Sequence, residues 1–436
     1  MVELVLASVF LVGSMYYVHG AGFKGEKSIY YVLASILAPA LFYILHNLDL
    51  RRLSVFREPA ILVNMTLLFL LVLLFPIFNH FAGVIPGFKL HEKRKITPEP
   101  VPEWKTLLQY PREYTPYYND HFVLRNHFIY LQNFLEVKWF GVSPIPKVLV
   151  GRDGWLFIAR EKSDRDCTEY FRAVKPFTSA ELEHWKNILE QRRKWLADRG
   201  IHYLFVIAPN KNTIYPEYMP RHIRKTGNRS RMDQLLEYLE NHSKVPVLDL
   251  RPALRAAKKE YPVYARTDTH WSEYGAYIVH REIIEHISQY RDFKAAVPLP
   301  LSRFKINRET WGGGDLAKML SMPEVLTEEK FKLRPKSPLN AKGGKLKRLS
   351  RFVKRGYSEC KGALPVNIVM VHDSFYKKLK PYLSECFVRV QYIWDWNMNF
   401  YPHVIEQEKP ALVIDEMAER FLLDQRPINP KELASR

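Results

Sequence analysis

Two short segments of the chain carry side chains whose types and spacing suit acyl transfer. In the first, 266–275 (RTDTHWSEYG), Asp268 and His270 stand two positions apart. In an extended segment such side chains point the same way, so the carboxylate can take the proton of one imidazole nitrogen. The other nitrogen is then free to act as a base. A purely structural hydrogen bond between the two is the alternative.

The second segment, 366–383 (VNIVMVHDSFYKKLKPYL), reads as a buried strand that runs into a helix through Ser374. A serine at such a turn is held at the carboxyl edge of the sheet, with its own N–H at a helix N-terminus. That placement suits a nucleophile whose attack creates an oxyanion. A plain helix N-cap is the alternative for Ser374, and the neighbouring Asp373 is expected to be an acid of the helix N-terminus.

The elements that must position these residues form an α/β pattern. We expect strands at 203–208, 247–250, 366–371 and 411–414, and helices at 178–200, 272–287, 375–383 and 417–423. Thr178 and Glu181 form a capping box at the start of the first of these helices. Apolar strands that alternate with helices predict a mainly parallel sheet covered on both faces, with the active site at the carboxyl ends of the strands.

These motifs resemble the SGNH-hydrolase-like domain of the alginate O-acetyltransferase family (AlgX/AlgJ type). The matching stretches follow the family's order over about 145–425: GRDGWLFI (151–158), APNKNTIYPEYMP (208–220), TDTHWSEYGAY (267–277), GGDLAKML (313–320), HDSFYKKLKPYLSECF (372–387) and EQEKPALVIDEMAERFL (406–422). The resemblance implies that Ser374 is the nucleophile, His270 the general base and Asp268 its orienting acid. It also implies an acetyl-serine that passes its acetyl group to a sugar hydroxyl.

Five further residues are candidates for substrate or oxyanion contacts. Asn210 and Lys211 follow the strand 203–208 at the same edge of the sheet. Gly313 and Gly314 can supply an oxyanion N–H, or form a plain tight loop. His372 stands where many SGNH proteins have glycine, and it is a candidate donor. Three cysteines without CxxC spacing predict no metal site, and no cofactor is expected.

The N-terminal part reads as a membrane anchor. Three apolar segments, 2–22, 29–48 and 60–78, are each near the roughly 20 residues that a transmembrane helix needs. Buried helices or a cleaved signal peptide are the alternatives. Arginines in the second short loop place that loop in the cytoplasm and everything after residue 78 outside. The expected location is a bacterial inner (cytoplasmic) membrane, with the catalytic domain on the periplasmic side.

The predicted organisation is an anchor over 1–85, a charged, proline-rich linker over 86–103 and an SGNH-like domain over 104–436. The net charge of +19 and the 47% hydrophobic content exclude a disordered chain or an acidic metal buffer. Twelve Lys and Arg residues in 330–361 stand against one acid. We expect this stretch to be a solvated loop, a contact for membrane lipid or a holder of anionic polysaccharide, with no role in nucleic-acid binding.

The sequence therefore predicts a membrane-anchored O-acetyltransferase of an extracytoplasmic polysaccharide. Its expected partners are a polysaccharide acceptor and a multispan membrane acyltransferase that delivers acetyl groups. An acetyl esterase with the same triad, or a non-catalytic polysaccharide-binding scaffold, remains open.

Overall fold

The computed structural model describes most of the chain beyond residue 94. The described residues are 95–102, 108–122, 124–161, 165–344, 347, 348, 350, 353–424 and 427–430, with isolated helical positions between 63 and 75. The predicted spans 2–22 and 29–48 lie outside them, and 60–78 is described only in part. Among the helices of the described part, none has the length and apolar character needed to cross a bilayer.

The chain divides into two compact units, 1–144 with 318–325, and 145–317 with 326–436. In the first unit, helix α4 (Tyr110–His121) is followed by α5 (Arg125–Phe134) and a π-helical turn (Leu135–Trp139). The buried amide of Asn133 donates to the carbonyl oxygen of Leu320 at 2.8 Å within this unit. The second unit contains the candidate chemistry.

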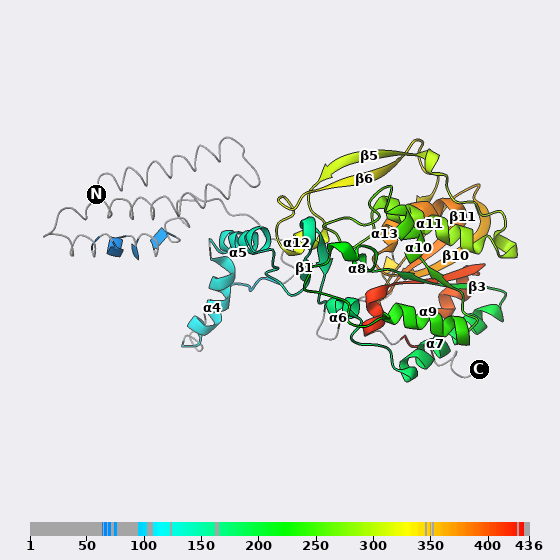
Figure 1. Cartoon of the computed structure of the whole chain (residues 1–436), viewed down its shortest axis with the longest axis horizontal. Helices are drawn as coiled ribbons and strands as arrows, with labels where there is room; N and C mark the ends of the chain where they lie inside the picture. Colours follow the sequence, from blue (N-terminus) through cyan, green and yellow to red (C-terminus); the bar gives the residue numbers. More distant parts are fainter. Residues whose placement is uncertain are drawn as a thin grey trace. The chain divides into compact units, whose positions relative to one another are not determined.

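The second unit is built on one large sheet with the strand order β4–β3–β12–β10–β11–β9–β7, and β8 also pairs with β9 (Figure 1). The strands are β3 (His202–Ala208), β4 (Val247–Asp249), β7 (Lys342–Gly343), β8 (Lys347–Arg348), β9 (Lys354–Glu359), β10 (Leu364–His372), β11 (Phe387–Trp394) and β12 (Leu412–Ala418). The five strands from β4 to β11 are parallel, while β9 runs antiparallel to β11. The predicted α/β class with a mainly parallel sheet is confirmed, with an antiparallel edge added.

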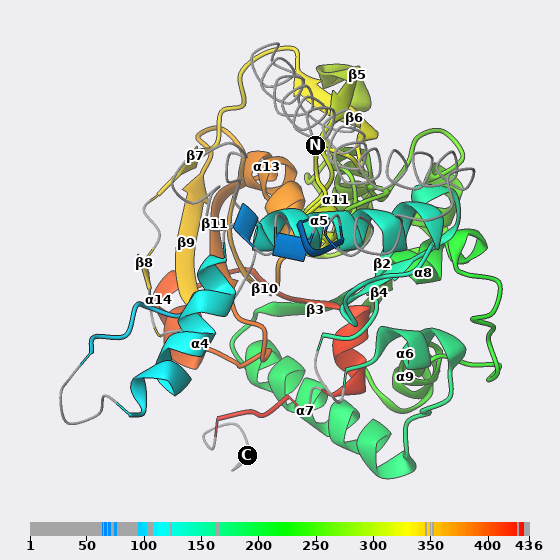
Figure 2. The ribbon, with the colours of Figure 1, turned by 90° about the vertical axis from the view of Figure 1, so that its left-hand side faces the viewer.

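Helices cover both faces of this sheet, which explains why its central strands are apolar throughout. Helices α7 (Ser179–Ala197) and α9 (Arg231–His242) lie on one side, and α11 (Glu273–Ile287) and α13 (Tyr376–Cys386) on the other (Figures 1 and 2). The remaining elements are α6 (Cys167–Arg172), α8 (Lys211–Ile214), α10 (Arg251–Ala257), α12 (Asp315–Met319), α14 (Pro402–Glu408) and two small antiparallel pairs, β1 (Val148–Val150) with β2 (Leu156–Ile158) and β5 (Phe304–Trp311) with β6 (Glu328–Pro335).

Local signals set the ends of the main helices as the sequence predicts. The Thr178 side chain accepts from the backbone N–H of Glu181, whose carboxylate accepts from the backbone N–H of Thr178. This is the predicted capping box. The Ser272 side chain likewise accepts from Gly275 at the start of α11. Gly200, with φ +70°, adopts the left-handed conformation that ends the α7 segment.

Two secondary-structure predictions are wrong. The expected helix at 417–423 is instead the end of β12 followed by a 3₁₀ turn over Glu419–Leu423, because Met417 and Ala418 continue the parallel pairing with β3. The stretch 330–361 is not a plain solvated loop, since it holds most of β6 and all of β7, β8 and β9. Three of its cations, Lys342, Lys347 and Arg348, stand on β7 and β8 at the edge of the sheet, where charged side chains discourage further strand pairing.

A buried ionic cluster joins α7 to the sheet. The guanidinium of Arg192, which has no exposed surface, donates to Asp415 at 2.8 Å, to Asn429 at 2.7 Å and to the carbonyl oxygen of Met398 at 2.5 Å. The Tyr203 hydroxyl donates to the same Asp415 carboxylate at 2.6 Å. Removal of one partner leaves a buried charge uncompensated, which costs far more than the loss of an exposed pair.

We therefore expect Arg192→Ala to lower the free energy of unfolding by about 3–5 kcal/mol. The neighbouring Arg193, whose ion pair with Glu190 is partly exposed, provides the control. Its alanine variant should lose no more than about 1 kcal/mol. Urea unfolding of both variants measures the difference, and equal losses would show that the buried cluster does not stabilise the fold in this way.

Candidate active site

The candidate residues come from four segments that meet at the carboxyl edge of the parallel strands. Ser374 lies two residues beyond the end of β10, and Asn210 lies two residues beyond β3. Arg420 follows β12 in the same way. The segment with Asp268 and His270 lies between α10 and α11. The site thus occupies the edge that the strand order predicts for an α/β sheet.

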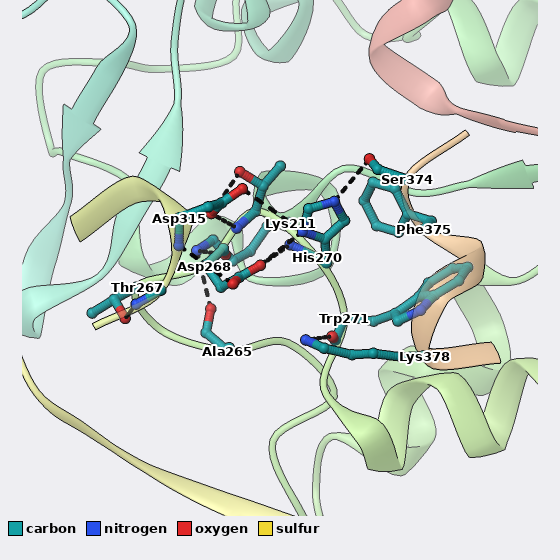
Figure 3. Close-up of polar contacts among 12 residues, drawn as sticks. Lys211, Ala265, Thr267, Asp268, His270, Trp271, Asp315, Ser374, Phe375 and Lys378 are labelled. Atoms are coloured by element: carbon teal, nitrogen blue, oxygen red, sulfur yellow. Dashed lines mark hydrogen bonds and ion pairs between the residues drawn. The ribbon is translucent and has the colours of Figure 1, made fainter. Parts of the chain in front are cut away.

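A continuous chain of contacts joins Ser374, His270 and Asp268. Nε2 of His270 lies 2.8 Å from the hydroxyl oxygen of Ser374, and Nδ1 lies 2.8 Å from Oδ1 of Asp268 (Figure 3). The same Oδ1 accepts from the backbone N–H of His270 at 3.0 Å. The hydroxyl, imidazole and carboxylate therefore have the geometry of a nucleophile, a base and an orienting acid.

The electrostatics of the site keep Asp268 ionised. Burial alone would raise its pKa, but the hydrogen bond from His270 and the positive charge of Lys378 outweigh burial and hold the pKa well below its usual range. Lys378 is itself fixed, since its ammonium donates to the carbonyl oxygen of Trp271 at 2.6 Å. A carboxylate accepts hydrogen bonds, so Nδ1 carries the ring proton and Nε2 is left to accept from Ser374.

Lys211 positions the loop that carries Asp268. Its buried ammonium donates to three backbone carbonyl oxygens, those of Ala265 at 3.1 Å, Arg266 at 3.0 Å and Asp268 at 2.7 Å (Figure 3). Burial lowers the pKa of Lys211 to about 8. The contacts give this lysine a positioning role, and the substrate contact expected from the sequence stays a prediction.

The sequence reading missed Asp315, a second carboxylate beside the histidine. Its Oδ1 accepts from the backbone N–H of Thr269 at 2.7 Å and from the hydroxyl of Thr269 at 3.2 Å. Its Oδ2 lies 3.7 Å from Nδ1 of His270. The only signal in the sequence was its place directly after the run of three glycines. Asp315 holds the backbone on one side of the imidazole, while Asp268 holds the ring.

Asp268, His270 and Asp315 also offer ligand atoms within 4.8 Å of one another, a spacing that a metal ion can bridge. Oδ1 of Asp268 and Nδ1 of His270 are already hydrogen-bonded to each other. Nδ1 would have to lose its proton before it could ligate a metal. The arrangement fits a base held by its orienting acid better than metal binding.

Gly314 is required for close packing against Asp268. A Cβ at Gly314 would lie 2.4 Å from the Cβ of Asp268, so any side chain there would displace the acid. The backbone N–H of Gly314 donates to the hydroxyl of Thr267 at 2.8 Å. That N–H is therefore engaged and does not face a reacting group. Gly313 is buried in the same turn.

A small polar pocket lies next to the serine turn, with Phe375 in its lining. Its lining residues are Phe157, Ile158, Asn210, Lys211, Asn212, Thr269, Phe375 and Arg420. Within the described part of the chain, four buried polar atoms here have no hydrogen-bond partner: Oδ1 and Nδ2 of Asn210, Oδ1 of Asn212 and Nη1 of Arg420. Unpaired buried polar groups are costly, so a cluster of them in one pocket marks a place for a polar ligand or for water.

His372 lies in an aromatic cluster behind the serine turn. Its ring stacks on Tyr376 with 3.5 Å between the ring centroids, and its Nδ1 donates to the carbonyl oxygen of Asp373 at 2.9 Å. Burial lowers the pKa of His372 to about 3. The ring is thus neutral, and Nδ1, the nitrogen that bears its proton, is already engaged.

Asp373 shapes the turn that presents Ser374. Its two carboxylate oxygens accept from the backbone N–H groups of Phe375 at 2.8 Å and Ala418 at 2.9 Å. These bonds tie the start of α13 to the end of β12. Burial raises the pKa of Asp373.

The second unit resembles an SGNH-hydrolase-like α/β domain. Residues 148–340 match the family model described as an SGNH hydrolase-like domain, acetyltransferase AlgX. The resemblance inferred from the motifs is confirmed. The matched segment includes Asp268 and His270 and ends before Ser374.

The similar proteins are named as O-acetylases. The probable alginate O-acetylase AlgJ of Pseudomonas aeruginosa is 27% identical over 190 residues, which cover 42% of this chain and 43% of that protein. The probable alginate O-acetylase AlgJ of Pseudomonas syringae pv. tomato is 29% identical over 178 residues, which cover 40% and 41%. The chain thus aligns with less than half the length of these relatives. The solved O-acetyltransferase domain of Pseudomonas putida AlgJ superposes with a TM-score of 0.44 at 19% identity, over 67% of this chain and 98% of that one.

The positioning role of Asp315 can be tested through the reactivity of Ser374 toward a sulfonyl fluoride. Asp315→Ala removes the acceptor for Thr269 and should slow labelling by about tenfold to a hundredfold. Asp315→Asn keeps an acceptor oxygen and should retain most of the rate. Asp268→Asn, which removes the acid that fixes the ring, should slow labelling by about 10⁴. Intact mass gives the rates. If Asp315→Asn reacted as slowly as Asp315→Ala, the negative charge and not the backbone contact would be what matters.

His372 predicts a loss of stability in acid. Its pKa of about 3 in the folded protein lies below the unfolded value of 6.5. Below pH 6.5 the unfolded chain therefore binds a proton that the folded chain excludes, and stability falls as the pH falls. Between pH 6.5 and 4.5 this group should lower the free energy of unfolding by about 2 kcal/mol.

His372→Phe, which keeps a flat ring against Tyr376, should remove that part of the pH dependence. Urea unfolding at both pH values measures the change. The exposed His403→Gln is the control, and an unchanged slope in His372→Phe would contradict the assignment.

Proposed function

We propose that this protein is an O-acetyltransferase that moves acetyl groups to hydroxyls of a polysaccharide through an acetyl-Ser374 intermediate. The contact chain from Ser374 through His270 to Asp268 carries the proposal, because it joins the three groups that acyl transfer requires. The names of the similar proteins support the acetyl group and the polysaccharide class.

In the first half of the reaction, the hydroxyl oxygen of Ser374 attacks the carbonyl carbon of the acetyl donor. Nε2 of His270 takes the hydroxyl proton, and the carbonyl oxygen becomes an oxyanion. The intermediate collapses when the bond to the donor's leaving group breaks, and His270 gives its proton to that group. Asp268 stays ionised throughout and stabilises the imidazolium.

In the second half, a sugar hydroxyl attacks the acetyl carbon of acetyl-Ser374. His270 takes the proton of the sugar hydroxyl, a new ester bond forms, and the bond to Ser374 breaks. The proton then returns from His270 to the oxygen of Ser374, which restores the enzyme. A water molecule in place of the sugar would turn the same steps into ester hydrolysis.

The polar pocket provides a place for the oxyanion. Nδ2 of Asn210 is a buried donor without a partner in the described structure, and the backbone N–H of Ser374 lies just before α13. Two such donors are the usual support for a tetrahedral oxyanion. The pocket is small and lined largely by polar groups, which disfavours a long apolar acyl chain.

The delivery of acetyl groups belongs to the same proposal. Membrane anchorage through 1–85 and an extracytoplasmic site would separate the enzyme from cytoplasmic acetyl donors. A multispan membrane acyltransferase is the partner proposed to supply acetyl groups. These points rest on the sequence patterns alone.

The test is acetylation of the full chain by a chromogenic acetyl ester, with and without an oligosaccharide acceptor. We expect an acetyl adduct on Ser374, found by intact mass and peptide mapping, that decays faster with acceptor and leaves acetylated sugar. Ser374→Ala should lower turnover by about 10⁴ and form no adduct, while the exposed Ser179→Ala should behave as wild type.

The other outcomes contradict the proposal in different ways. An adduct that decays equally with and without acceptor would make the protein an esterase. The absence of any adduct in the wild type would contradict both enzyme assignments and favour a binding scaffold.

A further inference from the structure

Two buried carboxyl groups lie together under the turn that presents Ser374. Asp373 directly precedes the serine, and Glu416 lies in β12, which pairs with the serine strand β10. The two residues are 3% and 1% exposed. The backbone N–H of Asp373 donates to Oε2 of Glu416 at 3.2 Å, and a hydrogen bond joins the two carboxyl side chains. Two carboxyl groups can hydrogen-bond to each other only when one of them holds a proton.

Glu416 is the member of the pair that holds the proton. The oxygens of Asp373 accept from the backbone N–H groups of Phe375 at 2.8 Å and Ala418 at 2.9 Å, which favours its ionised form. Glu416 lacks such support, because no donor of the described structure reaches its buried Oε1. A proton on Glu416 lets its side chain donate to the carboxylate of Asp373 and removes a buried negative charge.

Neighbouring cations do not replace this proton. Four further titratable groups lie near the pair: Arg420 after β12, His372 in β10, and Tyr264 and His270 in the segment before α11. The guanidinium of Arg420 lowers the pKa of Glu416, but burial and the charge of Asp373 outweigh it and keep that pKa well above its usual range. Arg420 is also paired with Glu161, at 3.1 Å. Its charge is thus divided among three carboxyl groups.

We propose that Glu416, as a protonated acid, is a positioning residue for Ser374. Its hydroxyl donates to the carboxylate of Asp373, and that carboxylate holds the two backbone N–H groups that shape the serine turn. Loss of the proton would place two negative charges against each other beneath the nucleophile, and their repulsion would distort the turn. The inference rests on the proposed function and adds to it an alkaline limit on the nucleophile.

The proton itself can be measured by infrared spectroscopy of the full chain. The difference spectrum between wild type and Glu416→Gln at neutral pH should contain the carbonyl stretch of a protonated carboxyl group, present in the wild type alone. An ordinary glutamate is ionised at that pH and gives no such band. A difference spectrum with carboxylate bands alone would overturn the proposal.

The positioning role is tested by the rate at which a sulfonyl fluoride labels Ser374, followed by intact mass. Glu416→Gln keeps a neutral donor of the same shape and should retain most of the rate. Glu416→Leu has a similar volume but no donor, and should slow labelling by about threefold to tenfold. As the pH rises, the wild type should lose rate relative to Glu416→Gln, because the glutamine has no proton to lose. A constant ratio of these two rates would overturn the alkaline limit.

Glu385 provides the matched control. It lies at the far end of α13, its side chain is 1% exposed, and its carboxylate accepts from the backbone N–H of Ala341. Glu385→Gln and Glu385→Leu should be labelled as fast as the wild type over the same pH range. Equal slowing in Glu385→Leu and Glu416→Leu would mean that the loss of any buried acid is enough, and would overturn the proposal.

Two results keep this inference apart from the proposed function. If the sulfonyl fluoride does not label the wild type, the proposed function fails, while the infrared band still decides whether Glu416 holds a proton. If the wild type is labelled but Glu416→Gln is as slow as Glu416→Leu, a neutral donor is not what the turn requires. The positioning role is then overturned and the enzyme assignment stands.

Discussion

The site depends on one contact, the 2.8 Å approach of the His270 imidazole to a hydroxyl that lies 104 residues away along the chain. Nothing local holds these two groups together. Ser374 is fixed by β10 and by the carboxylate of Asp373, while the loop of His270 is fixed by Lys211, Gly314 and Asp315. Much of the polar structure at this edge of the sheet holds the serine turn and the loop of His270 in the relative position that this contact requires.

The side chains around the serine turn are both polar and buried. The backbone N–H of Asp373 donates to Glu416 at 3.2 Å, and burial raises the pKa of both carboxyl groups, that of Glu416 further because of its acidic neighbour. The guanidinium of Arg420, paired with Glu161 at 3.1 Å, partly offsets this effect at Asp373. In such an environment a new charge interacts strongly with its neighbours, since water screens it little. An oxyanion formed here would be stabilised by fixed dipoles and not by mobile solvent.

The sequence predicted those parts of the site that depend on chain direction and short spacing. Asp268 reaches His270 because two residues separate them, and Ser374 stands at the edge because a buried strand ends just before it. Asp315 could not be found in this way, because its contact with Thr269 comes from the packing of a distant loop. The role of Lys211 was missed for the same reason, since its partners are backbone carbonyls that no residue type reveals. The extension of β12 past 414 shows tertiary pairing overriding a helical pattern.

The hydrogen bonds that hold Lys211 have a chemical consequence. An acyl group carried by Ser374 would be an electrophile in a site where a primary amine lines the adjoining pocket. An amine attacks only through its free lone pair, which the protonated form lacks. Three carbonyl oxygens accept hydrogen bonds from the ammonium. Burial lowers the pKa of Lys211 to about 8, and the negative charges of Asp268, Asp315 and Glu328 oppose that effect. In the proposed mechanism, the bonds that shape the loop would also keep this amine from attacking the acyl group, and that effect would weaken as the solution becomes alkaline.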